Sequence, residues 1–409
     1  MRPVIVIVGL AVLACSSQSE RSTEAPKPPF ARSVAPSASP VASAVSSPSM
    51  PRRWPKSAFT IDETAIAVPF PWVSEAALVE PSGTVHILAG PPSDRGSCGF
   101  SAGAALSPDG RRALYVVART TGDGVVRRDG VPLSGNDEVA PSLRLIDLAT
   151  DVDTLVADGA CAPAWAADGR IAYVQGAVAG WSPGRGPRSG TIVVRATPGG
   201  RPAVWSSEAA GYQDLRFVGG GILATRLDPD MSALVLFGRP GAARVVGRKM
   251  QLIAVAPSGS RALVTTIPDL YGSERATVRL LRLPDGGELS SLRLDPEAEN
   301  LAQGGSWQGV RVVTSVGYFP GGTTHPRPAL FILDTTGDRL RIEEEFGFAS
   351  RLVGPGPFAD FQQPSFVDSS HVAGLFGYFG ERYLSCDLVA HVCAAWRLQA
   401  NDRQATLLR

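Results

Sequence analysis

The chain has 409 residues, of which 39 are lysine or arginine and 38 are aspartate or glutamate, so its formal net charge is +1. This balance excludes the strongly basic surface of a nucleic-acid-binding protein and predicts no attraction to an anionic membrane face. After the N-terminal segments described next, roughly 350 residues remain, which is long enough for a large hydrophobic core.

The N-terminus predicts an export signal. An apolar run at residues 4–13 follows a single arginine and is too short to span a bilayer as a helix. The stretch Val12-Leu13-Ala14-Cys15 resembles the processing box of bacterial lipoproteins, which implies cleavage before Cys15 and lipidation of its thiol. The alternative is an ordinary secretory signal in which the cysteine has no role. We therefore expect a signal peptide at residues 1–14, lipid attachment at Cys15, and a membrane-anchored position at the cell envelope facing the extracytoplasmic side.

The next segment, residues 15–57, is rich in serine, proline and alanine, as in SVAPSASPVASAVSSPSMP, and holds few large apolar residues. Such a composition cannot bury enough apolar surface to offset the entropy cost of folding. We expect a disordered tether here. The folded domain is expected at residues 58–409, because no second segment of this composition follows.

One pattern recurs between residues 98 and 398: a large apolar residue, a short turn, then a strand of alternating or β-branched residues. Asp-Gly, Ser-Gly and Gly-Gly supply turn conformations that β-branched residues cannot adopt. A second strand pair follows each turn, as in SLRLIDLATDVDTLVA. Four strands in about 50 residues, repeated without helical periodicity, predict the blades of a β-propeller. The apolar repeat residues are Leu106, Trp165, Phe217, Val255, Trp307 and Phe366.

The stretches LSPDGRRALYV, WAADGRIAYV and VAPSGSRALV resemble the SPDG-type repeats of TolB-like β-propellers. The resemblance implies an all-β propeller of four-stranded antiparallel sheets, in which each turn joins the two inner strands of a blade, and it implies contacts with envelope proteins. Six units account for residues 98–398. The segment before them holds three further candidate strands, including TAIAV at 64–68, and QATLLR at the C-terminus is a fourth. We favour seven blades, with six as the alternative, because pairing these strands removes open edges.

Four cysteines besides Cys15 predict disulfides, since bridges persist in exported proteins. Cys386 and Cys393 lie in two apolar runs around a hairpin turn, and we expect them to be bridged across facing strands. Cys98 and Cys161 precede equivalent turns in consecutive units and would form a second bridge if their strands are neighbours. The alternative for the first pair is a metal site with His391, which lacks a fourth ligand.

No motif predicts a catalytic residue, a cofactor or a resident metal. The stretch Gly180-Trp181-Ser182-Pro183-Gly184 matches G-x-S-x-G, but the glycines and prolines after Ser182 exclude the helix that a nucleophile elbow requires. The four histidines are scattered. Acidic clusters such as Asp147, Asp151 and Asp153 lack the spacing of an EF-hand calcium loop.

The acidic residue of the repeat turn differs between units. Asp109 in the first unit corresponds to Asp168 in the second but to Ser258 in the fourth. A turn tolerates this exchange, because aspartate and serine both bond to nearby main-chain N–H groups, whereas a shared catalytic role would not. We therefore interpret the repeat turns as structural.

Three long insertions, residues 120–142, 176–190 and 317–328, each follow the strand after a repeat turn. Because they occupy equivalent places in three units, we expect them to emerge on one face and form a binding surface. Trp181 lies in a Gly/Pro-rich stretch where no periodicity demands burial, so it is a candidate anchor for a partner. The candidate binding residues are Arg127, Arg128, Trp181, Arg185, Tyr318 and Phe319.

Together these features predict a lipid-anchored, non-catalytic propeller that binds or scaffolds envelope proteins or peptides. It is expected to be monomeric, to contact the membrane only through its lipid, and to bind no cofactor and no nucleic acid. The alternative is a propeller hydrolase, lyase or lectin that acts on an envelope carbohydrate or peptide, with paired carboxylates in its channel.

Overall fold

The computed structural model divides the chain into two units, Met1–Arg52 and Arg53–Arg409, and every described residue belongs to the second. Among these residues no helix has the length and apolar character needed to cross a membrane. The expected signal peptide, Cys15 and nearly all of the tether lie outside the described part of the chain. The structure describes residues 57–62, 77–79, 85–87, 104–118, 127–128, 131–132, 141–176, 190–227, 232–266, 277–293, 304–318, 327–348, 361–376, 382–397 and 405–407.

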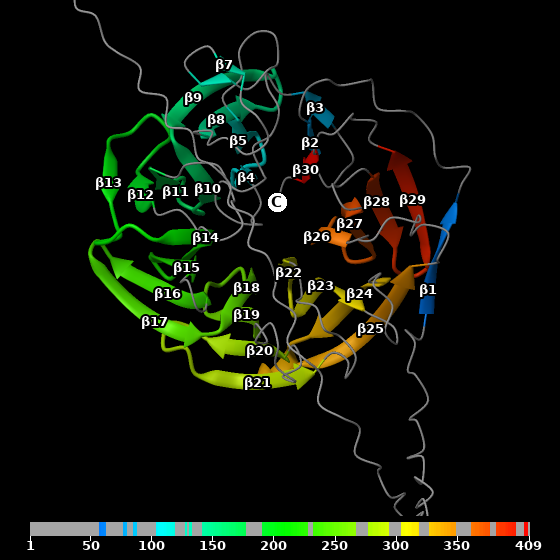
Figure 1. Cartoon of the computed structure of the whole chain (residues 1–409). Coiled ribbons are helices and arrows are strands. Elements are labelled where there is room, and N and C mark those ends of the chain that lie inside the picture. The colour runs from blue at the N-terminus through cyan, green and yellow to red at the C-terminus, as the bar shows by residue number, and fades with distance from the viewer. Residues whose placement is uncertain are drawn as a thin grey trace, which may run out of the picture. The chain divides into compact units, whose positions relative to one another are not determined.

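The repeat units form a β-propeller, as predicted (Figure 1). Each of the six units folds into a four-stranded antiparallel blade whose strands run in chain order from the innermost to the outermost. Blade one consists of β4 (Ala104–Leu106), β5 (Arg112–Ala118), β8 (Pro141–Asp147) and β9 (Val152–Asp158), blade two of β10 (Ala160–Trp165), β11 (Ile171–Gln175), β12 (Thr191–Arg195) and β13 (Pro202–Val204), and blade three of β14 (Gly211–Val218), β15 (Gly221–Leu227), β16 (Ser232–Arg239) and β17 (Ala242–Arg248).

The second half of the ring repeats the same plan. The innermost strands of these three blades are β18, β22 and β26, which lie nearest the centre of the ring (Figure 1). Blade four consists of β18 (Met250–Val255), β19 (Arg261–Thr266), β20 (Thr277–Arg282) and β21 (Glu288–Arg293), blade five of β22 (Gly305–Gln308), β23 (Arg311–Tyr318), β24 (Arg327–Asp334) and β25 (Arg341–Phe348), with the short 3-10 turn η2 (Thr336–Asp338), and blade six of β26 (Phe361–Phe366), β27 (His371–Phe376), β28 (Arg382–Asp387) and β29 (Val392–Arg397).

The repeat turn joins the two innermost strands of a blade, as the TolB-like repeats imply. In blade one, Asp109 accepts hydrogen bonds from the Ser107 hydroxyl at 2.6 Å and from the Arg111 main-chain N–H at 3.1 Å. These bonds favour the ionised carboxylate and lower the pKa of Asp109. Gly110 follows with a left-handed φ of 68°. In blade four, Ser258 takes the place of Asp109 and accepts from the Ser260 N–H, the exchange that we expect of a structural turn.

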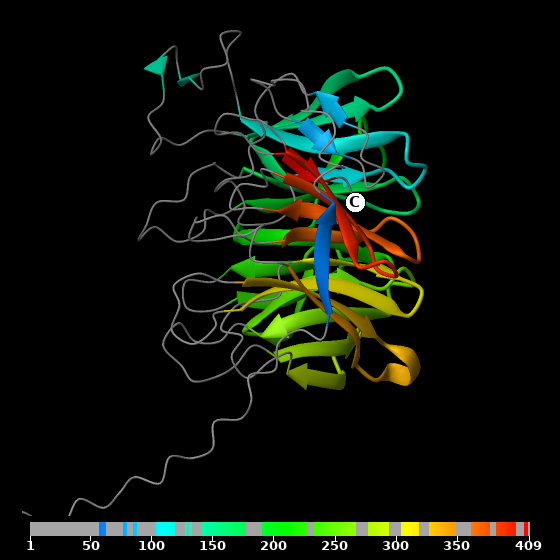
Figure 2. The same cartoon turned by 90° about the vertical axis from the view of Figure 1, so that its right-hand side faces the viewer.

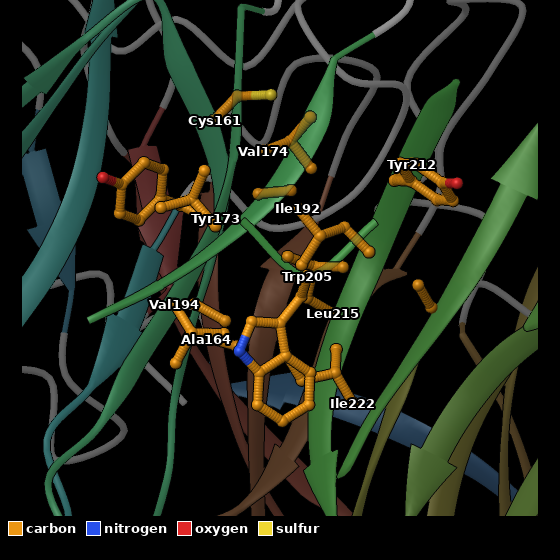
Figure 3. Close-up of a cluster of buried hydrophobic side chains, with 14 of the residues drawn as sticks. Cys161, Ala164, Tyr173, Val174, Ile192, Val194, Trp205, Tyr212, Leu215 and Ile222 are labelled. Atoms are coloured by element: carbon orange, nitrogen blue, oxygen red, sulfur yellow. The ribbon is translucent and has the colours of Figure 1, made fainter. Parts of the chain in front are cut away.

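The core lies between neighbouring blades. One cluster of buried side chains joins blades one, two and three, and Figure 3 shows Val174 and Ile192 of blade two on the side of Tyr212 and Ile222 of blade three, with Tyr173 on the opposite side of the blade. Further clusters join blades three and four and blades four and five. Blades two to five bury both of their faces in this way, so none of these four has an independent core.

Arginines reinforce three of the contacts between blades. Each follows a repeat turn and places its guanidinium over the aromatic repeat residue of the next blade, at 5.4 to 5.6 Å from the ring centroid. Such cation–π contacts contribute on the order of 0.5–1 kcal/mol when partly exposed. They therefore tie the inner strands of consecutive blades together. The pairs are Arg112 with Trp165, Arg170 with Phe217, and Arg311 with Phe366.

The strand β1 (Ser57–Asp62) links two blades on their outer side (Figures 1 and 2). Its first half pairs in parallel with β25 and its second half with β29. Phe59 is fully buried at the middle of β1 and stacks on Phe346 with 4.5 Å between ring centroids. The strand thus covers part of two edges whose main-chain groups would otherwise be open to other chains.

In the described part of the chain the propeller has six four-stranded blades, which is the alternative to the favoured number of seven. The predicted pairing between strands from the two ends of the chain is confirmed. A small sheet of β3 (Val85–Ile87), β2 (Ala77–Val79) and β30 (Ala405–Leu407) lies between blades six and one in Figure 1, with β30 parallel to β2. Three of the four strands expected here are thus paired, and the fourth, expected at 64–68, lies outside the described residues.

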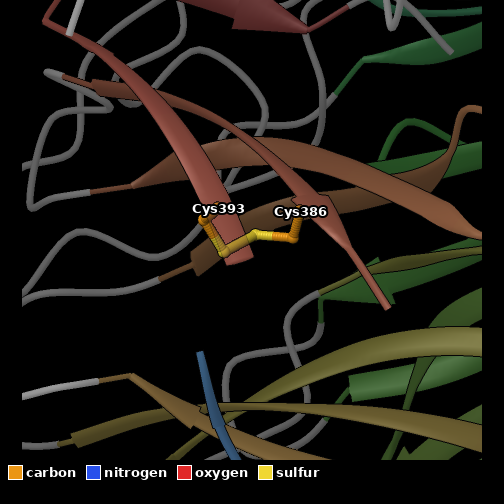
Figure 4. Close-up of a disulfide and its surroundings, with 2 residues drawn as sticks. All are labelled: Cys386 and Cys393. Carbon is orange, nitrogen blue, oxygen red and sulfur yellow. A yellow bond between two sulfur atoms is a disulfide. The ribbon is translucent and has the colours of Figure 1, made fainter. Parts of the chain in front are cut away.

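The predicted bridge between Cys386 and Cys393 is present and joins facing residues of β28 and β29, with 4.0 Å between their Cα atoms (Figure 4). Oxidised in this way, the two sulfurs cannot serve as the thiolate ligands of the alternative metal site. Cys161 is also disulfide-bonded. Its predicted partner Cys98 lies outside the described residues.

We predict that Phe59→Ala detaches β1 from the outer edges of blades five and six. Truncating a buried phenylalanine costs about 3–5 kcal/mol, so the melting temperature should fall and the amides of Phe346–Phe348 should exchange hydrogen faster. Thermal melting measures the first effect, and hydrogen-exchange mass spectrometry measures the second. The control is Val389→Ala, because that side chain is 80% exposed. Unchanged exchange in the first variant would contradict a role for Phe59 in holding the strand.

Candidate functional site

The common blade plan gives the propeller two distinct faces. Each second strand runs away from its repeat turn, so all six second strands end on the face opposite the turns (Figure 2). We call the side of the repeat turns the turn face and the other side the loop face. The three long insertions predicted as binding loops all leave the propeller from the loop face. The second strands end there at Ala118, Gln175, Leu227, Thr266, Tyr318 and Phe376.

The structure describes only part of the predicted binding surface. Arg127 and Arg128 form β6 (Arg127–Arg128), which pairs with β7 (Val131–Pro132) in a two-stranded hairpin. Tyr318 is the last residue of β23 and pairs with Arg327. The side chains of these three residues, and all of Trp181, Arg185 and Phe319, lie outside what the structure describes. That they form one surface stays a prediction.

One residue on the innermost strands departs from the repeat. The position directly before the apolar repeat residue is occupied by a small side chain in five blades and by Arg216 in blade three. Comparing the six units at this position would have revealed the arginine from the sequence alone. The five small residues are Ala105, Ala164, Ala254, Ser306 and Ser365.

The small side chains reflect crowding near the centre of the ring. Innermost strands of adjacent blades contact one another there, and Ser306 accepts a hydrogen bond from the main-chain N–H of Phe366 in the next blade at 2.9 Å. A β-bulge directly precedes the position in four blades. Asp214 in this bulge has a left-handed φ of 53°, and Ala162 at the matching place in blade two has a φ of 48°. Because two blades share this backbone conformation, it is a feature of the fold and not of the blade-three residues.

Three polar residues lie close together along β14, and Gln213 and Arg216 share one face of it, because they pair with Thr225 and Leu223 of β15, two residues apart. Arg216 donates to the carbonyl of Leu215 at 2.8 Å and lies in the field of the Asp214 carboxylate. Desolvation by the surrounding protein lowers the pKa of Arg216, and Asp214 opposes that shift. Gln213 is 3% exposed, and its Oε1 has no hydrogen-bond partner among the described residues. We call Gln213, Asp214 and Arg216 the blade-three cluster.

This cluster can hold a ligand that combines an acceptor with a donor. The Arg216 guanidinium offers N–H groups in a planar fork suited to a carboxylate. The Gln213 oxygen requires an N–H or O–H donor, because an unpaired buried oxygen costs on the order of 1–3 kcal/mol. The strand runs from the loop face inward, so Gln213 lies nearer that face than Arg216.

A second polar group gathers on the turn face of blade six. The Ser370 hydroxyl lies 3.1 Å from Nδ1 of His371, and this same nitrogen lies 3.0 Å from both oxygens of Asp368. Nε2 of His371 is 3.7 Å from Asp387. A nitrogen that donates to Asp368 has no lone pair with which to accept the serine proton. We therefore interpret the group as a turn and not as a catalytic triad.

Main-chain bonds support this interpretation. Asp368 accepts from the N–H groups of Ser370 at 2.7 Å and His371 at 2.8 Å. These bonds, with that from the His371 side chain, lower the pKa of Asp368 to about 2. The carboxylate thus occupies the same structural place as Asp109 and Asp168 in the other repeat turns.

The acidic residues weighed as calcium ligands already have partners. Asp147 accepts from the N–H groups of Ala149 and Thr150, both at 3.1 Å. Asp153 forms a two-bond ion pair with Arg144, at 2.5 and 2.9 Å, and also accepts from the hydroxyl of the buried Tyr115. Among the described residues no three His, Cys, Asp or Glu side chains are grouped as metal ligands.

Comparison with solved structures finds other propellers. A prolyl endopeptidase is 16% identical with a TM-score of 0.46, and the match covers 77% of this chain and 44% of that one. The propeller domain of the trilobed protease from Pyrococcus furiosus is 12% identical with a TM-score of 0.37, covering 74% and 98%. A protein described as TolB from Agrobacterium tumefaciens is 12% identical with a TM-score of 0.40, covering 65% and 93%.

These similarities concern the fold alone, since all three identities are low. The matched region spans less than half the length of the endopeptidase. No protein-family model and no curated protein sequence matches the chain. Its function must therefore be inferred from its own residues.

We predict that Asp153→Asn destabilises blade one by roughly 1.5–3 kcal/mol near neutral pH, because it removes the charge that Arg144 and Tyr115 bond. Arg144 holds the pKa of Asp153 below its usual value. The stabilisation is therefore complete above the unfolded pKa, near 4, and is lost as the pH falls through the lower folded value. Melting temperatures of both proteins between pH 7 and 3 measure the difference.

The difference between the two proteins should shrink below pH 4. Asp285→Asn is the matched control, since Asp285 pairs with Arg282 on the surface and both side chains are at least half exposed. If the difference in melting temperature between the parent and Asp153→Asn stayed constant across the whole pH range, the charge of Asp153 would contribute nothing to stability.

Proposed function

We propose that this chain is an exported, lipid-anchored and non-catalytic propeller that binds or scaffolds proteins or peptides at the cell envelope through its loop face. The observation that carries the proposal is the shared exit of the second strands on that face. A rigid ring that delivers long connections to one side is a suitable frame for a binding surface, because loops held by a scaffold can vary without loss of the core.

The composition of these connections supports a protein partner. The predicted surface residues, given above, are arginines and aromatic residues. Such side chains dominate the binding energy of protein interfaces, because they bury large areas and carry polar groups that pair with the partner. The proposal also agrees with the export signal and with Cys15, which would leave the propeller attached to the membrane through its N-terminal segment.

We predict that Cys15→Ser releases the protein from membranes. Without the thiol no lipid can be attached, and the removed apolar chains are the membrane contact that the proposal assigns. Fractionation of cells that express each form, together with labelling by radioactive palmitate, measures the effect. A variant that still carries label, or that stays in the membrane fraction, would contradict lipidation at Cys15.

We predict that Trp181→Ala, Arg185→Ala and Phe319→Ala together reduce capture of the partner at least tenfold, as expected when interface anchors are removed. Crosslinking and affinity capture of the full chain from its native membranes measures this. The matched control combines Arg111→Ala and Val367→Ala on the turn face, where both residues are exposed. Equal capture by all three proteins would overturn the assignment of binding to the loop face.

A further inference from the structure

The fold does not require an arginine at position 216. Five blades build the same innermost strand with alanine or serine at the matching position, and the small side chain suits the crowded centre of the ring. Placing a guanidinium there removes part of its hydration, which is costly for a permanently charged group. Asp214 offsets only part of this cost, because Arg216 remains less basic than a solvated arginine. A ligand that pairs with Arg216 would offset more of it.

The neighbouring glutamine narrows the chemistry of such a ligand. Gln213 Oε1 is buried and has no partner within the described part of the chain. The ligand must therefore bring an N–H or O–H donor beside the group that Arg216 binds. A phosphate offers mainly acceptors and two negative charges, so it would leave Gln213 unpaired and be repelled by Asp214. A carboxylate with an adjacent amide N–H satisfies both residues.

These two groups stand together at the C-terminal end of every peptide. We propose that the blade-three cluster binds the C-terminus of a peptide chain that enters from the loop face. The terminal carboxylate pairs with Arg216, and the last main-chain N–H donates to Gln213 Oε1. Asp214 offsets part of the desolvation of Arg216 when the site is empty. The inference rests on the proposed binding function and names the class of group that the propeller recognises.

The test compares peptides that differ only in their last group. The immobilised full chain is incubated with a pool of N-acetylated random pentapeptides that end in a free carboxylate, mixed with an isotope-labelled pool that ends in an amide. Mass spectrometry measures the ratio retained. We expect the free-acid pool to be enriched at least tenfold, because the amide carries no charge for Arg216. Equal retention of the two pools, or retention of neither, would overturn the proposal.

Two variants assign the effect to the cluster. Arg216→Ala should reduce the enrichment to less than twofold, and Gln213→Leu should reduce the retention of both pools severalfold, because both carry the main-chain N–H that Gln213 accepts. Arg244→Ala is the matched control, since Arg244 is exposed on the outermost strand β17 of the same blade, and it should leave the enrichment unchanged. Enrichment that persists in Arg216→Ala would overturn the proposal.

Thermal melting separates a binding role from a structural one. Because five blades carry alanine or serine at this position, Arg216→Ala should melt within about 2 °C of the parent, a small shift for a domain of this size. A large drop would mean that Arg216 supports the fold and would overturn the proposal. Capture of the partner through the loop face is measured in a separate experiment. If the partner is captured but the acid and amide pools are retained equally, the C-terminus site is rejected and the proposed function stands.

Discussion

Apolar packing between neighbouring sheets is the interaction on which the ring depends. A single four-stranded sheet has two faces and cannot bury both by itself, so every blade relies on the blade before it and the blade after it. The buried clusters span two or three blades accordingly. A ring held in this way must also close. In this chain β1 bridges blades five and six through Phe59, and β30 pairs with β2 across the gap between the two ends of the repeat.

The same packing crowds the centre of the ring, and this makes Arg216 informative. Where adjacent innermost strands meet, the chain places alanine or serine, and Ser306 shows why, since its hydroxyl bonds the backbone of the next blade. A charged residue at one of six equivalent positions follows no rule of the fold. Departures from local consistency tend to mark functional sites, since the fold gives no reason to keep them. Gln213 lies nearer the loop face than Arg216 does, so a peptide that reached Arg216 from that face would also meet the loops.

Much of the architecture could be predicted because its causes are local. Asp109, Gly110 and their equivalents form turns through bonds within a few residues, and the hairpin around Val389 brings Cys386 opposite Cys393 without help from the rest of the chain. The number of blades could not be predicted in the same way. It depends on how strands from the two ends of the chain pair, and β2 and β30 are far apart in the sequence.

The sequence by itself determined the repeat, the turn chemistry, the all-β character and one disulfide, because these follow from residues close together in the chain. The tertiary structure decided how the ring closes, which arginine lies over which aromatic ring of the next blade, and that Arg216 shares β14 with a buried, unsatisfied glutamine oxygen. Those features join residues from separate units or depend on burial. Burial is set by the whole ring, since each blade is covered only by its neighbours.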